Sequence, residues 1–453
     1  MPSPWDIPLR PPARRRPVAA NRSRRSSTTT PTARRVLTDG LPAGCNLASV
    51  RSLLPEARSL LPRTVDLRRR LHRNPERGNH LPLTRALVLG ELESLPLEIT
   101  AHETTSGLAA VLRGARPGPT ILLRGDMDAL PVLEDTGLPF ASERAGLMHA
   151  CGHDLHTAML AGAARLLAAR RDELAGTVLF MFQPGEEGFF GAKLMLEEGL
   201  LDTAGERPSG AFALHVSNLY PSGTVWFRAG PQMAATDEVA ITIRGNGGHA
   251  STPHLASDPI PVAAEIILAV QTAVTRRINV FEPGVITFAR MDAGTTHNVI
   301  PETARLLGTV RALSRTTRTE LHALLHRVAG NVAAAHGVEA DVEFGVGYPV
   351  TVNDPGYTEF VRSVARHALG EGRVSEPPWP SMGGEDFSFV LDEVPGTMAY
   401  LGTCPPGREP GQVPGNHSNR VVFDEDAMAT GMALHAAVAM SHGMDGLAGG
   451  TSR

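Results

Sequence analysis

Short apolar runs alternate with amphipathic, helix-like stretches along most of the chain, starting near Leu47. Short runs with few polar residues are typical of strands buried on both faces, as in a parallel sheet covered by helices. The clearest runs are Thr120–Leu123, Thr177–Phe182, Ala211–Leu214 and Met398–Leu401. The pattern therefore predicts an α/β fold with a mainly parallel sheet.

A different pattern occupies residues 234–345, where strand and helix signals follow one another in the order β-α-β-β-α-β. This is the split arrangement of a ferredoxin-like domain. The six elements are expected at Glu238–Arg244, Pro259–Arg277, Gly284–Arg290, Ala304–Arg311, Thr317–His336 and Glu339–Phe344. Because a helix at Tyr357–Leu369 and a further strand follow, we interpret the block as an insertion. The larger domain is then discontinuous, formed by residues 46–233 and 346–442.

Composition limits the range of partners. A chain of 453 residues with 42% hydrophobic content is too long for one compact core, which agrees with two domains. A formal net charge of -4 gives no basic excess that would indicate nucleic acid. No apolar run approaches the roughly 20 residues needed to cross a bilayer. We therefore expect a cytoplasmic protein with a small-molecule substrate and without a nucleic-acid or membrane partner.

Cysteines and the chain ends add little chemistry. Three cysteines in so long a chain do not suggest a disulfide scaffold, which favours a reducing compartment. Residues 1–45 combine many arginines with Pro, Ser and Thr and hardly an acid, so we predict a disordered tail. An organelle transit peptide and a misassigned start codon are alternatives. Residues 443–453 are predicted to form a second tail.

Acidic residues and imidazoles follow three of the predicted strands. Asp126 and Asp128 end the first run, Glu186 and Glu187 follow the second, and His215 ends the third. Ligands in open α/β sheets bind at the carboxyl ends of the strands. We expect these side chains to converge on one crevice.

The densest cluster of metal-binding side chain types is His149–His156, which contains Cys151 and His153. A thiolate and imidazoles together suit zinc or a similar first-row divalent ion. A buried cysteine beside helix-capping histidines is the structural alternative. Of the two neighbouring glutamates, one could bind metal while the other accepts a proton from water, although adjacent acids more often form a solvated corner.

The remaining candidates are single residues. Asp126 or Asp128 could orient a ligand histidine, or could cap a turn. His215 and His417 are each more often structural than ligating, and only their occurrence with the other candidates favours a metal role.

The chain resembles the metallo-amidohydrolase family of hippurate hydrolases, N-acyl-amino-acid amidohydrolases and indole-acetyl-amino-acid hydrolases. The resemblance runs in order from about residue 50 to about residue 440. The segments that carry it are Leu123–Pro131, Met148–Met159, Gln183–Glu187, Gly247–His249, Asn298–Pro301 and Met382–Phe387.

The resemblance implies a dinuclear site for two divalent ions, which could be zinc, manganese, cobalt or nickel. The implied ligands are Cys151, His153, Glu187, His215 and His417. Glu186 would be the general base, and Asp128 would hold a ligand histidine. The inserted domain would act as a lid and as the surface of a homodimer. From it His249 would stabilise the oxyanion, and Asn298 would contact the substrate.

We therefore predict metal-dependent hydrolysis of the amide bond of an N-acyl amino acid, such as a hippurate-like or acetyl-amino-acid substrate. Arg311 could bind a substrate carboxylate, but a salt bridge on the strand surface explains it equally well. Phe189 and Phe190 stand where relatives commonly carry glycine, so we expect them to reshape the acyl pocket. The alternatives are a dipeptidase or aminopeptidase on the same site and a catalytically inactive ligand-binding relative. Retention of every implied ligand and of Glu186 argues against the inactive relative.

Overall fold

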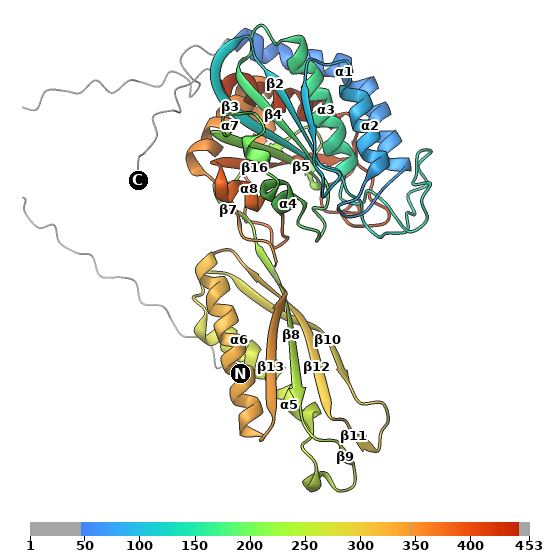
Figure 1. The fold of residues 1–453 in the computed structure, drawn as a ribbon, viewed down its shortest axis with the longest axis vertical. Coiled ribbons are helices and arrows are strands. Elements are labelled where there is room, and N and C mark those ends of the chain that lie inside the picture. Colours follow the sequence, from blue (N-terminus) through green and yellow to red (C-terminus); the bar gives the residue numbers. More distant parts are fainter. Residues whose placement is uncertain (1–46, 346, 444–453) are drawn as a thin grey trace, which may run out of the picture. The chain divides into compact units, whose positions relative to one another are not determined.

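The computed structural model describes residues 47–345 and 347–443. The predicted N-terminal tail, Cys45 and residues 444–453 lie outside them. The described residues form an eight-stranded sheet, a four-stranded sheet and two short two-stranded ribbons (Figure 1). None of the helices in these residues is long and apolar enough to cross a membrane.

The eight-stranded sheet is parallel in its middle, has antiparallel pairs on both sides of the middle, and ends at one edge in the parallel pair of its last two strands. Its order is β1 (Glu98–Ala101), β2 (Leu108–Arg113), β4 (Ala175–Gln183), β3 (Arg116–Asp126), β5 (Gly210–Pro221), β16 (Gly396–Cys404), β6 (Val225–Trp226) and β15 (Val374–Ser375). The pairs of β3 with β4 and β5, and of β5 with β16, are parallel. This confirms the prediction of a mainly parallel sheet. All nine residues of β16 are buried, which explains the apolar run in the sequence.

The four-stranded sheet is antiparallel throughout. Its order is β10 (Gly284–Ala293), β12 (Thr303–Ala312), β8 (Ala235–Arg244) and β13 (Glu339–Gly345). Buried and more exposed residues alternate along β8, so one face packs against α5 (Pro259–Arg277) and α6 (Arg315–Ala335). The side chains of Asp258 and Ser314 cap these helices by accepting main-chain N–H groups. The elements follow the expected β-α-β-β-α-β order, whereas a lid or dimerisation role stays a prediction.

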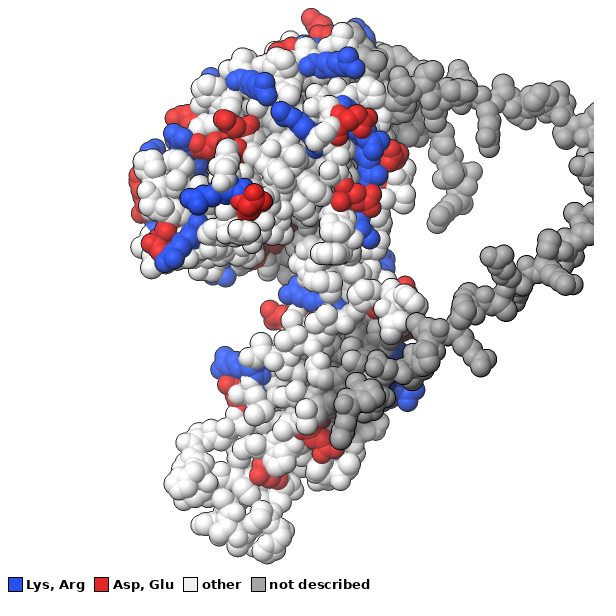
Figure 2. Space-filling view, turned by 180° about the vertical axis from the view of Figure 1, so that it is seen from behind, with Lys and Arg blue, Asp and Glu red and all other residues white. Residues whose placement is uncertain are grey.

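Two connecting segments at one end of the four-stranded sheet contain no charged residue. There a ribbon pairs β9 (Gly248–His249) with β11 (Val299–Ile300), close to the short helix η2 (Pro253–Leu255). Residues 245–257 and 293–301 contain no Asp, Glu, Lys or Arg. Figure 2 shows this end in white, while acidic and basic side chains are interspersed over the larger part of the molecule.

Helices cover both faces of the eight-stranded sheet. One apolar cluster contains Leu108, Ala110 and Leu112 of β2, and the other contains Ala109 and Val111, because successive side chains of a strand point to opposite faces. The first cluster is completed by α1 (Leu47–Arg73), α2 (Pro82–Leu92), α3 (His153–Ala169), α7 (Pro355–Leu369) and α9 (Ala427–His442). The second is completed by α4 (Gly191–Glu197), η1 (Leu200–Asp202) and α8 (Ser388–Glu393).

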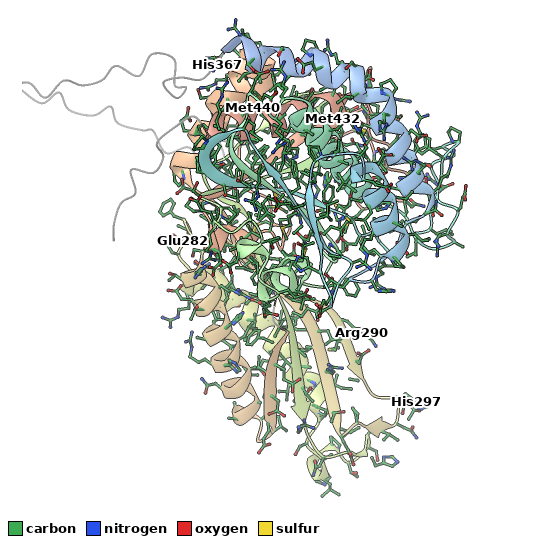
Figure 3. All side chains as sticks on the ribbon, turned by 45° about the horizontal axis from the view of Figure 1, so that its top comes forward. Glu282, Arg290, His297, His367, Met432 and Met440 are labelled. Atoms are coloured by element: carbon green, nitrogen blue, oxygen red, sulfur yellow. The ribbon has the colours of Figure 1, made fainter. Side chains whose placement is uncertain are left out.

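Helix α9 is buried along its whole length. Met432 and Met440, labelled in Figure 3, are 0% and 2% exposed. A helix that is apolar all round belongs inside a protein, where it packs against α1, α3 and α7.

Strand register brings the candidate side chains together at the carboxyl ends of the central parallel strands. Asp126 pairs with Gln183, and Tyr400 pairs with His215. Near these strand ends the chain passes between the two sheets through β7 (Gly230–Met233) and β14 (Thr351–Asn353), which pair with each other. The last short helix, η3 (Glu371–Arg373), precedes β15.

Candidate active site

A glycine sets the start of α3, between two candidate ligands. Gly152 has φ +87°, and a Cβ atom there would lie 2.3 Å from Cγ2 of Val216. Only glycine meets both demands without strain. It lets Cys151 and His153, the first residue of α3, flank the helix start at the edge of the sheet.

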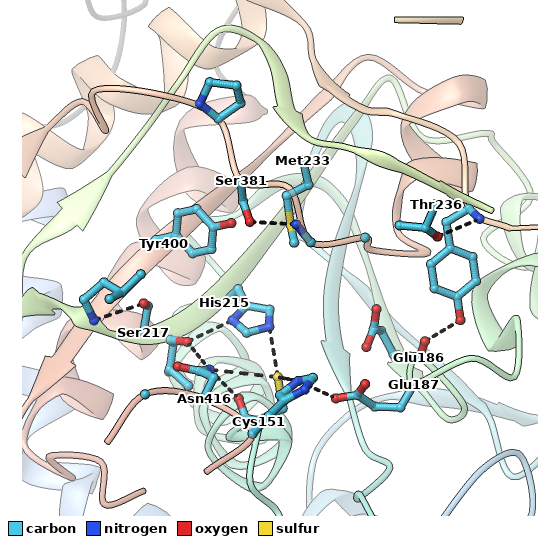
Figure 4. Close-up of a pocket in the computed structure, with 18 of the residues that line it drawn as sticks. Cys151, Glu186, Glu187, His215, Ser217, Met233, Thr236, Ser381, Tyr400 and Asn416 are labelled. Carbon is cyan, nitrogen blue, oxygen red and sulfur yellow. Dashed lines mark hydrogen bonds and ion pairs between the residues drawn. The ribbon is translucent and has the colours of Figure 1, made fainter. Parts of the chain in front are cut away.

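The structure brings all five predicted ligands together. Figure 4 shows Cys151, Glu187 and His215 among them. The Sγ atom of Cys151 lies 3.5 Å from Nε2 of His215 and 3.3 Å from Nε2 of His417. The same His417 nitrogen lies 3.2 Å from Oε1 of Glu187. Donor atoms of Cys151, His153 and His215 lie within 4.8 Å of one another, as do those of Cys151, Glu187 and His417. These side chains come from four separate parts of the chain.

The arrangement fits divalent metal ions. Nε2 of His153 is buried and makes no hydrogen bond, and the closest carboxylate oxygens lie 3.5 Å away on Asp126 and 4.0 Å away on Glu186. A buried imidazole nitrogen without a partner is costly unless it binds something. Thiolate, imidazole and carboxylate together are the ligand types of zinc and other first-row ions.

Main-chain oxygens orient the two buried histidines. Nδ1 of His153 lies 2.9 Å from the carbonyl oxygen of Asp128, and Nδ1 of His215 lies 2.9 Å from that of Val216. In a neutral imidazole the nitrogen that donates to a carbonyl carries the proton, so Nε2 keeps a free lone pair. The unpartnered Nε2 of His153 and the Nε2 of His215 beside Cys151 are therefore placed where they could bind a metal ion.

Asp128 acts mainly on the segment Glu186–Gly188, which we call the glutamate turn. Its two carboxylate oxygens accept the main-chain N–H groups of Glu186 and Glu187 at 3.0 and 3.1 Å. Its contact with His153 is made chiefly through the carbonyl oxygen, because the carboxylate lies 3.4 Å from Nδ1. The histidine-holding role expected from the resemblance is therefore shared with a second one, alignment of the glutamate turn.

Sequence reasoning missed Tyr348, which holds the other side of the glutamate turn. Its hydroxyl accepts the N–H of Gly188 at 2.8 Å and donates to the carbonyl oxygen of Glu186. Nothing in the sequence marks it, since it is a single tyrosine after β13.

Burial and neighbouring charges prepare Glu186 and Cys151 for opposite roles. Glu186 is only 6% exposed, which excludes the solvated-corner interpretation. Its burial, together with the charges of Glu385 and Glu187, holds the pKa of Glu186 well above its usual value. Burial opposes ionisation of Cys151, but His215 and His153, when protonated, outweigh it through their charge and hydrogen bonds and hold the pKa of the thiol well below its usual value.

A buried arginine, which sequence reasoning also did not identify, binds acids of the Met382–Phe387 segment. Arg124 is fully buried, and it binds Asp126 at 2.7 Å and Glu385 at 2.8 Å. Gln183 links Arg124 to Asp386. Arg124 offsets part of the negative charge of these acids, of which Glu385 and Asp386 lie close to Glu186.

The donor cluster opens into a hollow of about 710 Å³. One part of its lining is apolar, with Leu219 62% exposed, Trp379 74% exposed and Met233 beside them. Arg311, half-buried, also lines the hollow and makes no hydrogen bond or ion pair with the described residues. The structure therefore does not support the salt-bridge explanation of Arg311.

His249 and Asn298 are not brought to the cluster. Both are exposed in or beside the β9–β11 ribbon, at the end of the four-stranded sheet marked in Figure 3 by the neighbouring His297. Thr236, near the other end of β8, lines the hollow. The ten residues of β8 span about 30 Å, so this chain does not place its own His249 beside its own Glu186.

Neither Phe189 nor Phe190 lines the hollow itself, so their effect on the acyl pocket stays a prediction. Phe189 lies under the guanidinium of Arg77, with 5.1 Å between the guanidinium carbon and the ring centre. Phe190 packs edge-on against Tyr348, with ring centres 4.9 Å apart. Phe190 has a left-handed main-chain conformation, with φ +57°.

The chain is similar to known proteins over most of its length. The chain is 36% identical over 395 residues to thermostable carboxypeptidase 1 of Saccharolobus solfataricus, covering 86% of this chain and 98% of the relative. It is 39% identical to the N-acetyl-L-cysteine deacetylase of Bacillus subtilis, covering 75% and 80%. A solved dinuclear metal-binding M20 peptidase from Bacillus subtilis superimposes with a TM-score of 0.73 at 34% identity, covering 84% and 98%.

The family pattern itself extends over most of the described structure. Residues 122–441 match the description "Peptidase family M20/M25/M40". This range includes every candidate ligand, Glu186, the connections between the sheets and the whole four-stranded sheet. The chain is a member of peptidase family M20/M25/M40.

Proposed function

We propose that this protein is a metal-dependent amidohydrolase that hydrolyses N-acyl amino acids to a carboxylic acid and an amino acid. The observation that carries the proposal is the meeting of five metal-binding side chains around a buried glutamate, beside a hollow that offers both an apolar surface and an unpaired arginine. Membership of the family and the named deacetylase relative support the amidohydrolase chemistry.

Two divalent ions would be held by Cys151, His153, Glu187, His215 and His417. Cys151 belongs to the triad with His153 and His215 and to the triad with Glu187 and His417, so it would help to hold the ions at either group. Bound ions of this kind polarise an amide carbonyl and lower the pKa of water. Zinc, manganese, cobalt and nickel all accept this donor set.

Glu186 would move the proton. Its raised pKa suits a group that accepts a proton from the attacking water and then donates it to the leaving nitrogen. In this reaction an O–C bond forms, the C–N bond breaks, and the amine leaves with the transferred proton. Asp128 and Tyr348 would keep Glu186 in place through their hydrogen bonds to the glutamate turn.

The hollow offers a different binding surface for each end of an N-acyl amino acid. Arg311 would bind the α-carboxylate, because an unpaired half-buried guanidinium is suited to a planar carboxylate. Leu219 and Trp379 would receive the acyl group, since exposed apolar side chains gain free energy when a ligand covers them.

The four-stranded sheet, from residue 234 to residue 345, would serve as lid and homodimer surface. Strand β10 lies at the edge of the sheet, and Val285 and Met291 on it are 43% and 47% exposed. An unpaired edge strand with exposed apolar side chains can pair with a second copy. His249 and Asn298 would then reach an active site by closure or from a partner copy. Sedimentation of the purified protein as a monomer would contradict the dimer.

The peptidase alternatives receive less support. An aminopeptidase or dipeptidase must bind a free ammonium group, but the only acids that line the hollow among the described residues are Glu186 and Glu187. The carboxypeptidase relative is chemically compatible with our proposal, because the last residue of a peptide is itself an N-acylated amino acid. Both described cysteines are free, which agrees with a reducing compartment, and we propose the cytoplasm.

The test is release of free amino acid from hippurate, N-acetyl amino acids, indole-acetyl conjugates and plain dipeptides, before and after chelation. Glu186→Gln should abolish hydrolysis, whereas Glu197→Gln, a solvent-exposed glutamate on α4, should leave it intact. Chelation should remove activity and divalent ions should restore it. Inert metal-loaded protein would overturn the proposal, and cleavage of dipeptides alone would favour the peptidase.

A further inference from the structure

Tyr348 is hydrogen-bonded to Thr236 where the chain connects the two sheets. Its main-chain oxygen accepts the N–H of Thr236 at 3.0 Å, and its own N–H donates to Oγ1 of Thr236 at 3.3 Å. Thr236 belongs to β8, where the chain enters the four-stranded sheet. Tyr348 follows β13, where the chain leaves that sheet. The two connections are therefore fastened to each other at these residues.

The phenol of Tyr348 reaches the catalytic side. Its hydroxyl bridges the glutamate turn, accepting from Gly188 and donating to Glu186. The side chain is held there by Phe190 and Phe389, whose ring centres lie 4.9 and 6.2 Å from its own. Tyr348 is only 7% exposed, and burial raises its pKa, so the hydroxyl keeps the proton that it donates.

Thr236 also connects Tyr348 to the strand that carries Arg311. In the pairing of β12 with β8, Arg311 stands directly opposite Thr236, and both residues line the hollow. Hydrogen bonds lead from Thr236, the strand partner of Arg311, through Tyr348 to the carbonyl of Glu186.

We propose that Tyr348 is a positioning residue that couples binding of the substrate carboxylate at Arg311 to the placement of Glu186. The proposal rests on the function proposed above, in which Arg311 holds the carboxylate. A shift of about 1 Å in a catalytic group can cost about a hundredfold in rate, so two hydrogen bonds to the glutamate turn are sufficient to matter. Removing the hydroxyl takes away both bonds to the tyrosine and leaves the N–H of Gly188 and the carbonyl of Glu186 only their 2.8 Å hydrogen bond to each other.

The first variant is Tyr348→Phe, which keeps the ring and removes only the hydroxyl. The matched control is Tyr357→Phe on α7, a buried phenol whose oxygen makes only a weak 3.5 Å contact with His442. We expect kcat of Tyr348→Phe to fall about 10- to 100-fold, with a KM and a thermal unfolding temperature close to those of the control. Thr236→Val should lower kcat in the same direction but less, because it removes only the bond from Tyr348 N–H.

The second step separates coupling from simple support of the fold. Wild type, Arg311→Met, Tyr348→Phe and the double variant are compared on an N-acyl amino acid and on its α-carboxamide. In wild type the carboxylate substrate should have the higher kcat, and this advantage should shrink in Tyr348→Phe as it does in Arg311→Met. The two substitutions should be non-additive in kcat on the carboxylate substrate and additive on the carboxamide.

The outcomes distinguish this proposal from the function on which it rests. Additive effects on both substrates, an unchanged kcat of Tyr348→Phe, or equal losses on both substrates would overturn the coupling while leaving the amidohydrolase intact. Wild-type protein that is inert on N-acyl amino acids when loaded with metal would overturn both. A loss of unfolding temperature without a loss of kcat would assign Tyr348 to stability alone.

Discussion

Replacing Gly152 by alanine tests whether the backbone before α3 sets the position of Cys151 and His153. The substitution adds one methyl group at a position that is buried and lies between these two candidate ligands. It changes no charge and removes no hydrogen-bonding group. Any effect must therefore come from the backbone angle or from the space that the methyl group needs.

Both costs follow from the structure. A non-glycine residue in the left-handed region, here at φ +87°, loses roughly 1–2 kcal/mol. The new Cβ atom would lie 2.3 Å from Cγ2 of Val216, so either β5 or the Cys151–His153 main chain must move. Such overpacking costs about 1–3 kcal/mol. We expect a total loss of about 2–5 kcal/mol in the free energy of unfolding, and a weaker affinity for divalent metal.

The assay measures denaturant unfolding, metal affinity by competition with a chelating dye, and kcat. Val216→Ala removes the obstructing methyl group, so the double variant with Gly152→Ala should recover the packing part of the loss. Gly90→Ala on α2 is the matched control, because no atom lies within 4 Å of its added Cβ and a helical alanine stabilises by up to about 1 kcal/mol. Wild-type stability and metal affinity in Gly152→Ala would refute the reasoning, and absence of rescue would refute its steric part.

Three further predictions concern the site and its support. Asp128→Asn replaces one acceptor of the glutamate turn by an N–H₂ group, so steady-state kinetics should show kcat falling by about 10- to 100-fold, equivalent to about 1.5–3 kcal/mol. Burial tends to raise the pKa of Glu134, but the hydrogen bond with His72 helps to lower it to about 2, so the carboxylate stabilises the folded state at neutral pH. Glu134→Gln should therefore cost about 1–2 kcal/mol at pH 7 after allowance for solvent screening, and thermal unfolding should show this difference shrinking as pH falls from about 4.5 toward 2. Trp379→Ala should lower kcat/KM about tenfold for N-benzoyl substrates, equivalent to about 1.4 kcal/mol of lost apolar contact, and much less for N-acetyl substrates; equal losses would place the acyl group elsewhere.

Local patterns in the sequence were sufficient to predict helices and strands whose side chains are buried. The α5 bounds Pro259–Arg277 were predicted without error, because a proline after the capping Asp258 starts the helix. The apolar core of β3 was recognised but its first residues, Arg116–Pro119, were not, since they are largely exposed and show no strand pattern. Periodicity reports which side chains are buried, and it is silent where a strand runs through solvent.

The side-chain types that could bind metal ions were also recognised from the sequence. Acids and imidazoles after buried strands predicted one crevice, and strand register brings Asp126 and His215 to the same edge. A metal-dependent amidohydrolase could be predicted because the required side chains recur in order along the chain. Their individual roles as ligand, base and orienting group stay predictions.

Tertiary structure alone decided the distances between parts of the chain that are remote in sequence. His417 meets Cys151 across 266 positions, and Tyr348 meets Glu186 across 162. It also placed His249 at the far end of β8, away from the cluster. The physical reason is that local periodicity depends on immediate neighbours along the chain. The meeting of loops depends on strand register and on how whole elements pack, and no single segment of the sequence contains that information.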